Sequence, residues 1–231
     1  ELCREIGVAI PVGKDSMSMR TRWEDDNGEH NVVAPVSLIV SAFAPVTDVT
    51  KHLTPQLRKT DEPSYLLLFD LGEGRNRLGG SCLAQAYRRT GGRTADLDNP
   101  ELLKGLFAAV QELNARDMVL AYHDRSDGGL LATVAEMIFA SRLGATLTLS
   151  GSRIELLRRL FAEEPGAVVQ VAKSKLPQVQ MVLDRNGLKA EAIGLVTDSA
   201  KLVVKSGEEF VLELERATMQ REWSEMSYRI Q

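Results

Sequence analysis

Short apolar runs alternate with segments of helical spacing from Ser64 onward. The continuous apolar run Tyr65–Phe69 predicts a buried strand. Asn99 and Pro100 open a segment whose apolar residues recur at helical spacing, which predicts a helix with Asn99 as its N-cap and Pro100 in its first turn. The apolar positions of this helix are Leu103, Leu106, Phe107, Val110 and Leu113.

The same reading predicts the remaining elements of this part of the chain. Helices are expected at about 80–90, 128–143, 153–163, 175–186 and 216–229, and strands at about 118–122, 145–149, 167–172, 189–196, 201–204 and 210–214. Strands that alternate with helices favour an α+β (mixed α/β) domain in which helices cover a mixed sheet.

The first part of the chain has a different pattern. Residues 32–49 are rich in β-branched and apolar residues and predict one or two strands. The stretch 47–63 is polar and contains two prolines, which is typical of a connection between domains. We therefore expect a partial β-rich domain over residues 1–50, a linker over 51–63 and an α/β domain over 64–231.

Composition removes several classes of function. The formal net charge of −4 provides no basic surface of the kind that nucleic acid requires. Cys3 and Cys82 are far apart and lack metal-ligand spacing, which argues against a disulfide framework or a zinc site and favours a reducing cytosol. No apolar run is long enough to span a membrane, and no leader opens the chain. A cytoplasmic protein is the expectation.

The turn from His123 to Gly129 is the strongest candidate site. It places two carboxylates, a hydroxyl and two glycines between a strand and a helix. Such a turn can hold a divalent cation on its carboxylates while free backbone N–H groups face phosphate. This reading makes Asp124 a metal ligand and Ser126 a nucleotide contact, with His123 as a structural hydrogen-bonding residue. The alternative is that Asp127 only caps the helix.

Two further segments are weaker candidates. Lys14, Asp15 and Ser16 offer a cation for phosphate, a base or metal ligand, and a hydroxyl, although the alternation along residues 16–21 also fits an ordinary strand. The loop 71–81 contains four glycines that allow a backbone to approach phosphate, or that make it a flexible connection. Ser81 is a candidate cap for the helix that follows this loop.

The motifs together resemble large-type phosphoribosylformylglycinamidine synthase (FGAM synthetase). The resemblance is carried by Ile10–Met19, by Arg77–Ser81, by Ala121–Leu130 and by Trp223–Arg229. It implies a chain that covers the end of the second N-terminal synthetase-like domain and the second C-terminal domain, which has the fold of aminoimidazole ribonucleotide synthetase.

The resemblance also implies an activity, that of an ATP-dependent C–N ligase of de novo purine biosynthesis. ATP activates an amide oxygen of formylglycinamide ribonucleotide, and ammonia from glutamine displaces phosphate. The implied cofactors are Mg²⁺ and ATP or ADP, and the implied partners are the remaining domains of the same long chain, including a C-terminal glutaminase. The chain alone is expected to be inactive.

Residue roles follow from the same resemblance. Asp124 is implied as a magnesium ligand, and Ser126 with Gly128 and Gly129 as nucleotide-binding residues, in an auxiliary site that retains ADP. Lys14, Asp15 and Ser16 are implied to face the substrate cleft. Two other interpretations remain open, namely a structural Mg-ADP-binding module without a catalytic role and a kinase of the same superfamily.

Overall fold

The computed structural model describes residues 2–16, 18–34, 37–89 and 91–230, and it divides the chain into two units. The first unit comprises Glu1–Thr50 and the second Lys51–Gln231. None of the helices in these described residues has the length and apolar character needed to cross a bilayer.

The first unit contains little regular structure. It has one short helix and an antiparallel hairpin, namely α1 (Leu2–Ile6), β1 (Arg20–Asp25) and β2 (Gly28–Val33). The prediction of strands over 32–49 is wrong for most of its length, because β2 ends at Val33 and the described residues 37–49 form no strand. A strand needs a neighbour for its backbone hydrogen bonds, and no described strand pairs with this segment. Residues 35 and 36 of this prediction lie outside the described part.

The second unit is built on a seven-stranded mixed sheet in the order β4-β6-β3-β7-β5-β8-β9. All neighbouring strands are antiparallel except β5 and β8. The strands are β3 (Ser64–Asp70), β4 (Ala121–Asp124), β5 (Gly144–Thr148), β6 (Gly166–Ala172), β7 (Ala190–Thr197), β8 (Lys201–Ser206) and β9 (Glu209–Glu215). The predicted α+β class with a mixed sheet is confirmed.

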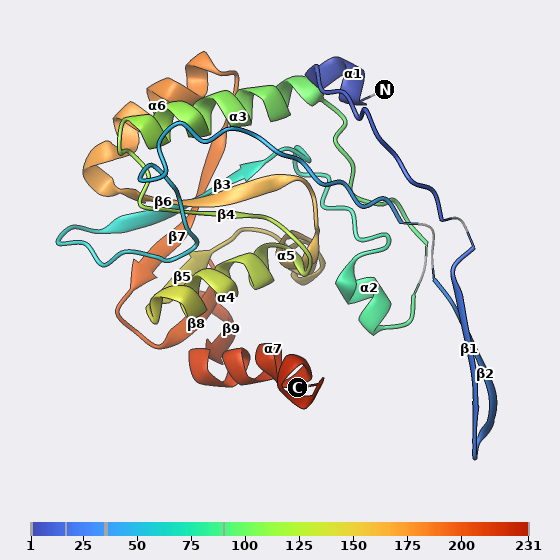
Figure 1. The fold of residues 1–231 in the computed structure, drawn as a ribbon. Helices are drawn as coiled ribbons and strands as arrows, with labels where there is room; N and C mark the ends of the chain where they lie inside the picture. The colour runs from blue at the N-terminus through green and yellow to red at the C-terminus, as the bar shows by residue number, and fades with distance from the viewer. Residues whose placement is uncertain (1, 17, 35–36, 90, 231) are drawn as a thin grey trace. The chain divides into compact units, whose positions relative to one another are not determined.

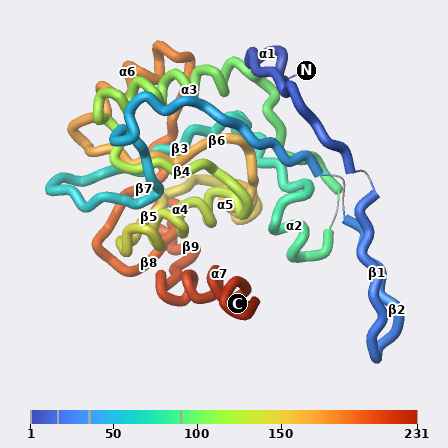
Figure 2. Tube along the Cα trace, viewed as in Figure 1, coloured from blue at the N-terminus to red at the C-terminus, as the bar shows by residue number. Residues whose placement is uncertain are grey.

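Helices cover both faces of this sheet (Figures 1 and 2). One face carries α3 (Pro100–Ala115) and α6 (Leu176–Arg185), and the other carries α4 (Gly129–Ser141), α5 (Arg153–Phe161) and α7 (Arg216–Ile230). The short elements are α2 (Cys82–Ala86) and a 3-10 turn at Lys173–Lys175.

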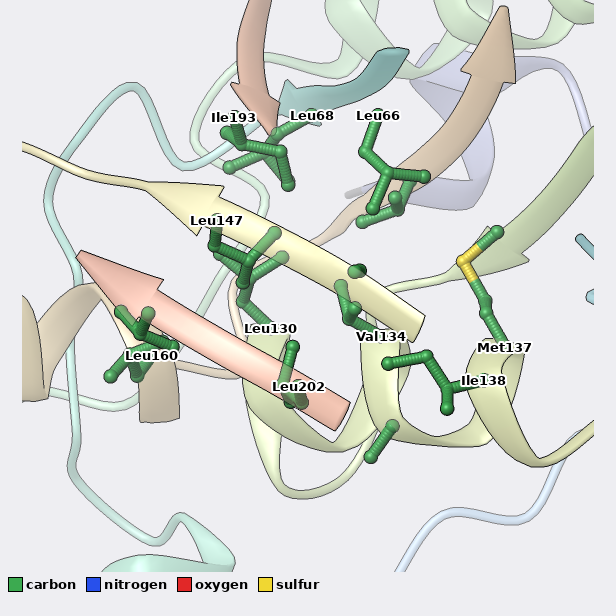
Figure 3. Packing of buried hydrophobic residues seen from close by; sticks show 14 of the residues in the cluster. Leu66, Leu68, Leu130, Val134, Met137, Ile138, Leu147, Leu160, Ile193 and Leu202 are labelled. Atoms are coloured by element: carbon green, nitrogen blue, oxygen red, sulfur yellow. The ribbon is translucent and has the colours of Figure 1, made fainter. Parts of the chain in front are cut away.

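The interior strand β3 is buried on both sides, and its residues 66–69 are all apolar. Leu66 and Leu68 belong to the cluster beneath α4 and α5, whereas Leu67 and Phe69 belong to the cluster beneath α3 and α6. Figure 3 shows the first of these clusters, in which side chains of the strands meet those of α4. Successive side chains of a strand point to opposite faces, so a strand between two helical layers lacks polar alternation.

The predicted helix after Asn99 is present with its expected cap. The Asn99 side chain accepts a hydrogen bond from the amide of Glu101, and Pro100 is the first helical residue. Phe107 is a correction, because it is 67% exposed. The face that packs on the sheet includes the predicted Leu106 and Leu113, and Ala109 is buried there as well.

Three other boundaries differ from the sequence reading. The helix expected at 80–90 is limited to α2, and the strand expected at 118–122 starts at Ala121. Residues 51–63, expected to be a linker, belong to the second unit. The Lys51 ammonium pairs with Asp117 at 2.6 Å, and the buried Gln170 amide exchanges hydrogen bonds with the backbone of Arg58.

Candidate functional site

The candidate turn lies where β3 and β4 both end. We call this end of the strands the sheet edge. Each of these strands pairs antiparallel with the start of β6, Asp70 opposite Gly166 and Asp124 opposite Ala167. The segment 125–128, which leads from β4 into α4, therefore lies beside the loop that follows β3. We call residues 123–129 the β4–α4 corner.

Arg125 anchors this corner to the sheet edge. Its side chain is 1% exposed, and its guanidinium group pairs with the Asp70 carboxylate. It also donates to the backbone carbonyls of Glu164 and Pro165. The Arg125 amide donates to the Gly166 carbonyl at 2.9 Å. The corner is therefore held by a buried cation with several acceptors, the arrangement that a buried charge needs.

A second buried ion pair fixes the glycine-rich loop 71–81. The Glu164 side chain is fully buried and accepts hydrogen bonds from the amide and the guanidinium group of Arg77, at 2.7–2.8 Å. The Asp70 carboxylate accepts from the amides of Gly72 and Gly74. These bonds fix the loop to the ends of β3 and β6, which argues against the alternative of a flexible connection. Ser81 caps α2 as predicted, accepting from the amide of Ala84.

Asp124 is exposed at the end of β4, and its carboxylate is oriented by a neighbour. The Tyr122 hydroxyl donates to Oδ1 at 2.6 Å, while Oδ2 makes no hydrogen bond or ion pair within the described ranges. Burial, then the hydrogen bond to Asp124 and lastly the charge of Asp124 raise the pKa of Tyr122 above its ordinary value. The phenol thus stays protonated and remains a donor, which leaves one carboxylate oxygen directed to solvent.

These features fit a single-carboxylate magnesium ligand whose orientation is set by a second residue. Within the described residues, Asp124 belongs to no group of three potential ligands. A magnesium ion at Asp124 would therefore take its other ligands from phosphate oxygens, water or residues outside such a group. Ser126 is exposed beside it, and its hydroxyl makes no hydrogen bond with the part of the chain that is described.

The two glycines of the corner differ from expectation. Gly128 and Gly129 have φ values of +84° and +70°. Their amides are not free, because that of Gly128 donates to Glu163 at 2.8 Å and that of Gly129 to the Ser126 carbonyl at 2.9 Å. Asp127 does not cap α4, since the N-cap is Gly128 and no side chain caps it. The simple capping alternative is therefore wrong.

The packing around residue 129 also requires glycine at this position. A Cβ at this position would lie 2.7 Å from the Phe161 carbonyl carbon and 2.8 Å from the Ala162 carbonyl oxygen. The start of α4 thus contacts the end of α5 directly through backbone atoms. Left-handed φ and this close approach both require glycine here.

The structure brings together one group that sequence spacing did not predict. Potential ligand atoms of Cys82, Asp127 and Glu163 lie within 4.8 Å of one another. The Glu163 carboxylate is held by the amides of Cys82 and Gly128, at 2.8 Å each. Partial burial, followed by the charge of Glu163, raises the pKa of the Cys82 thiol above its ordinary value. A raised pKa leaves a smaller fraction of Cys82 as the reactive thiolate at neutral pH.

The reactivity of Cys82 tests whether the Glu163 charge acts on its thiol. Alkylation by iodoacetamide requires the thiolate, so the Cys82 rate should rise with pH along a curve displaced above that of a free cysteine, whose pKa is about 8.5. Glu163→Gln keeps an acceptor for both amides and removes the charge. We expect Cys82 to react several-fold faster in this variant at pH 8, measured by mass spectrometry of the Cys82 peptide. Glu208→Gln, outside this group, should leave the rate unchanged, and equal rates in all three proteins would contradict the assignment.

Lys14, Asp15 and Ser16 lie in the first unit, in exposed chain without regular secondary structure. The Lys14 ammonium donates to the Ser16 hydroxyl and to the Asp15 carbonyl. The strand alternative for residues 16–21 is confirmed only at its end, since β1 begins at Arg20. Met17 lies outside the described residues.

Comparison with known proteins decides the family. The sequence model of the AIR synthase related protein C-terminal domain matches residues 66–207, more than half of the chain. The chain belongs to the AIR synthase-related family. The model of the FGAR-AT PurM_N-like domain matches residues 1–45. The two matches confirm the resemblance to FGAM synthetase that the sequence motifs indicate.

Solved structures give this AIR synthase-related chain the same fold. "T. maritima PurL complexed with FGAR" superposes with a TM-score of 0.58 at 15% identity, covering 74% of this chain and 30% of that one. Phosphoribosylformylglycinamidine synthase II from Thermotoga maritima has a TM-score of 0.56 at 16% identity, with 71% and 27% covered. The PurL complex with ATP has a TM-score of 0.55 at 16% identity, with 70% and 26% covered. The chain thus spans less than a third of the length of these structures.

Proposed function

We propose that this chain is a segment of an ATP-dependent ligase, FGAM synthetase, and that its β4–α4 corner binds a magnesium nucleotide. The observation that carries the proposal is the Asp124 carboxylate, exposed at a strand end and oriented by Tyr122, with the exposed Ser126 hydroxyl at the entry to α4. The matched FGAR-AT domain at residues 1–45 supports the choice of enzyme within the family.

The similar structures support the classes of ligand. The printed descriptions of the Thermotoga maritima PurL structures name ATP, ADP and FGAR as bound molecules. By this likeness, the proposed substrates are formylglycinamide ribonucleotide, glutamine and ATP, and the product is formylglycinamidine ribonucleotide. The remaining domains of the enzyme, including the glutaminase that supplies ammonia, are proposed partners.

Each residue of the corner has a role in this proposal. Asp124 holds Mg²⁺ through its solvent-facing oxygen, and the Tyr122 hydroxyl fixes the carboxylate. Ser126 contacts the nucleotide, while Gly128 and Gly129 give the turn the shape that lets a phosphate approach. A bound magnesium ion would neutralise phosphate charge, which is its general role in phosphoryl chemistry. Lys14, Asp15 and Ser16 are proposed to face the substrate.

The Arg125 anchor makes the corner part of the folded structure, which is compatible with a retained nucleotide there. A corner fixed by a buried ion pair to the sheet edge is part of the fold, so a ligand bound there stabilises the folded state by mass action. The second candidate function, a structural Mg-ADP module, is therefore compatible with the ligase assignment, and Asp124 distinguishes the two contributions.

The test compares the parent enzyme with its Asp124→Ala variant. We expect the variant to retain less ADP on purification and to melt several degrees lower, because ligand stabilisation is lost. The amidation rate per folded molecule should change less than about twofold. Loss of a group that acts in the transition state would lower this rate far more. Asp198→Ala, at the opposite edge of the sheet, is the matched control.

Two other outcomes are informative. Loss of turnover with ADP and melting temperature intact would place Asp124 in the reaction itself. If ADP content, melting temperature and turnover all match the wild type, the corner is not a nucleotide site and the proposal fails.

A further inference from the structure

Glu136 connects the β4–α4 corner to the C-terminal helix α7. It is the one charged residue of α4, and its two carboxylate oxygens bind side chains from different elements. Oε2 lies 2.8 Å from Nε2 of His123, and Oε1 accepts from the indole N–H of Trp223 at 3.0 Å. His123 precedes Asp124 on β4, and Trp223 lies on α7. One side chain therefore spans three elements.

The Glu136–Trp223 bond is one of the contacts that attach α7 to the rest of the unit; at the start of α7, Arg216 also bonds to the carbonyls of Ala200 and Arg142. No residue of α7 is buried, although Met219 packs at the margin of the core cluster beneath α4. The Trp223 ring lies 5.8 Å from that of Phe139, which is also on α4. Beyond Arg216, the side-chain hydrogen bonds of Arg221 and Arg229 stay within α7, whereas that of Trp223 reaches Glu136. Glu136 and Phe139 thus both contact the Trp223 indole. Helix α7 lies beside α4 (Figure 1).

The same helix also holds the backbone of the corner. The Thr133 hydroxyl, one turn before Glu136 on α4, donates to the Gly129 carbonyl at 2.9 Å and also lies 3.3 Å from the Asp124 carbonyl oxygen. The side chain of His123 is thus bound to α4, and the carbonyl of Asp124 lies within reach of a hydroxyl of the same helix. Glu136 is therefore bonded to the residue that directly precedes the proposed magnesium ligand.

We propose that Glu136 is a positioning residue that makes the seating of α7 and the conformation of the β4–α4 corner depend on each other. What the corner binds rests on the proposed function, but the coupling does not. Because coupling between two sites is reciprocal, disturbing Trp223 must loosen the corner, and disturbing His123 must loosen Trp223. A ligand that fixes the corner would then also fix α7.

Substitutions at Glu136 separate the coupling from simple loss of charge. Glutamine can accept from the indole through its carbonyl and donate to the imidazole through its amide, so it can keep both bonds. Leucine is similar in size and can make neither. Glu136→Gln should therefore rescue what Glu136→Leu loses, a pattern that a purely electrostatic role does not give.

Hydrogen exchange provides the first readout and needs no nucleotide. In Glu136→Leu and in Trp223→Phe, amides of residues 121–125 should exchange about three- to tenfold faster, the range that one lost hydrogen bond supports. Glu136→Gln should resemble the wild type. Amides of α3, on the opposite face of the sheet, are the internal reference, because global destabilisation would accelerate them as well.

Tryptophan fluorescence provides the reciprocal readout. Trp23→Phe leaves Trp223 as the only tryptophan, since the chain has two. In this background, His123→Ala should increase acrylamide quenching of Trp223 although it removes no atom that Trp223 contacts directly. Arg221→Ala, whose bond stays within α7, is the matched control for both readouts and should change neither.

The proposal is overturned if Trp223→Phe leaves exchange at 121–125 unchanged relative to α3, or if His123→Ala leaves the quenching of Trp223 unchanged. Failure of the nucleotide proposal has a different signature. Mg-ADP would then not bind at Asp124, while both coupling measurements would still succeed.

Discussion

Replacing Arg125 with leucine is expected to lower the free energy of unfolding of the second unit by about 3–5 kcal/mol, as when one partner of a buried ion pair is removed. The guanidinium group is almost fully buried and is bound to Asp70 and to the carbonyls of Glu164 and Pro165. Leucine fills part of the space but leaves those carbonyls without this donor. Chemical denaturation followed by circular dichroism measures the change.

Two controls sharpen this result. Arg116→Leu removes a half-exposed arginine paired with Glu112 on α3 and should cost less than about 1 kcal/mol, as is typical of surface pairs. Arg125→Lys keeps the charge but lacks the planar fork that reaches several acceptors, so it should recover little of the loss. A cost for Arg125→Leu as small as that for Arg116→Leu would show that the anchor contributes little to the fold.

Alanine at Gly129 should be more damaging than alanine at Gly187, although both glycines have nearly the same backbone conformation. Their φ values are +70° and +67°. A Cβ at Gly187 meets nothing within 4 Å, whereas one at Gly129 meets the backbone of Phe161 and Ala162. Gly187→Ala therefore isolates the left-handed strain, about 1–2 kcal/mol. Gly129→Ala should add about 1–3 kcal/mol of overpacking.

Parallel urea titrations of both variants give this difference directly. The comparison bears on the corner, because Gly129 is also a proposed nucleotide-binding residue. Equal destabilisation of the two variants would mean that α4 and α5 can move apart, and the close backbone contact would then not explain the glycine.

Local patterns were sufficient for most of the second unit. Asn99 and Pro100 mark the start of α3 because an N-cap and a first-turn proline act within a few residues of chain. Phe107 is a residue whose burial such local patterns do not predict. Its spacing fits the apolar stripe, but which part of a wide stripe meets the sheet depends on how the helix is rotated against its neighbours, which no single segment encodes.

In the β4–α4 corner, too, local patterns identify some residues, whereas contacts between distant segments determine the others. Asp124 and Ser126 could be selected from residue type and position in a strand–turn–helix pattern. Arg125 lies between them and was not selected, because an arginine in a polar turn is usually solvated. Its burial depends on Asp70 and on the backbone at Glu164, which are distant in sequence. The Cys82 group and the Glu136 contacts were missed for the same reason, since each combines three separated segments.

The sheet order has a consequence for how the chain reaches its native state. The interior strand β3 is the first strand of its unit along the sequence, yet its two neighbours, β6 and β7, follow after β4 and β5. During synthesis, this apolar strand must remain unpaired until most of the unit has been made. Pairings between distant segments form slowly, and unpaired apolar strands associate with one another. Slower synthesis at low temperature, or a chaperone that shields β3, should therefore favour the yield of folded protein.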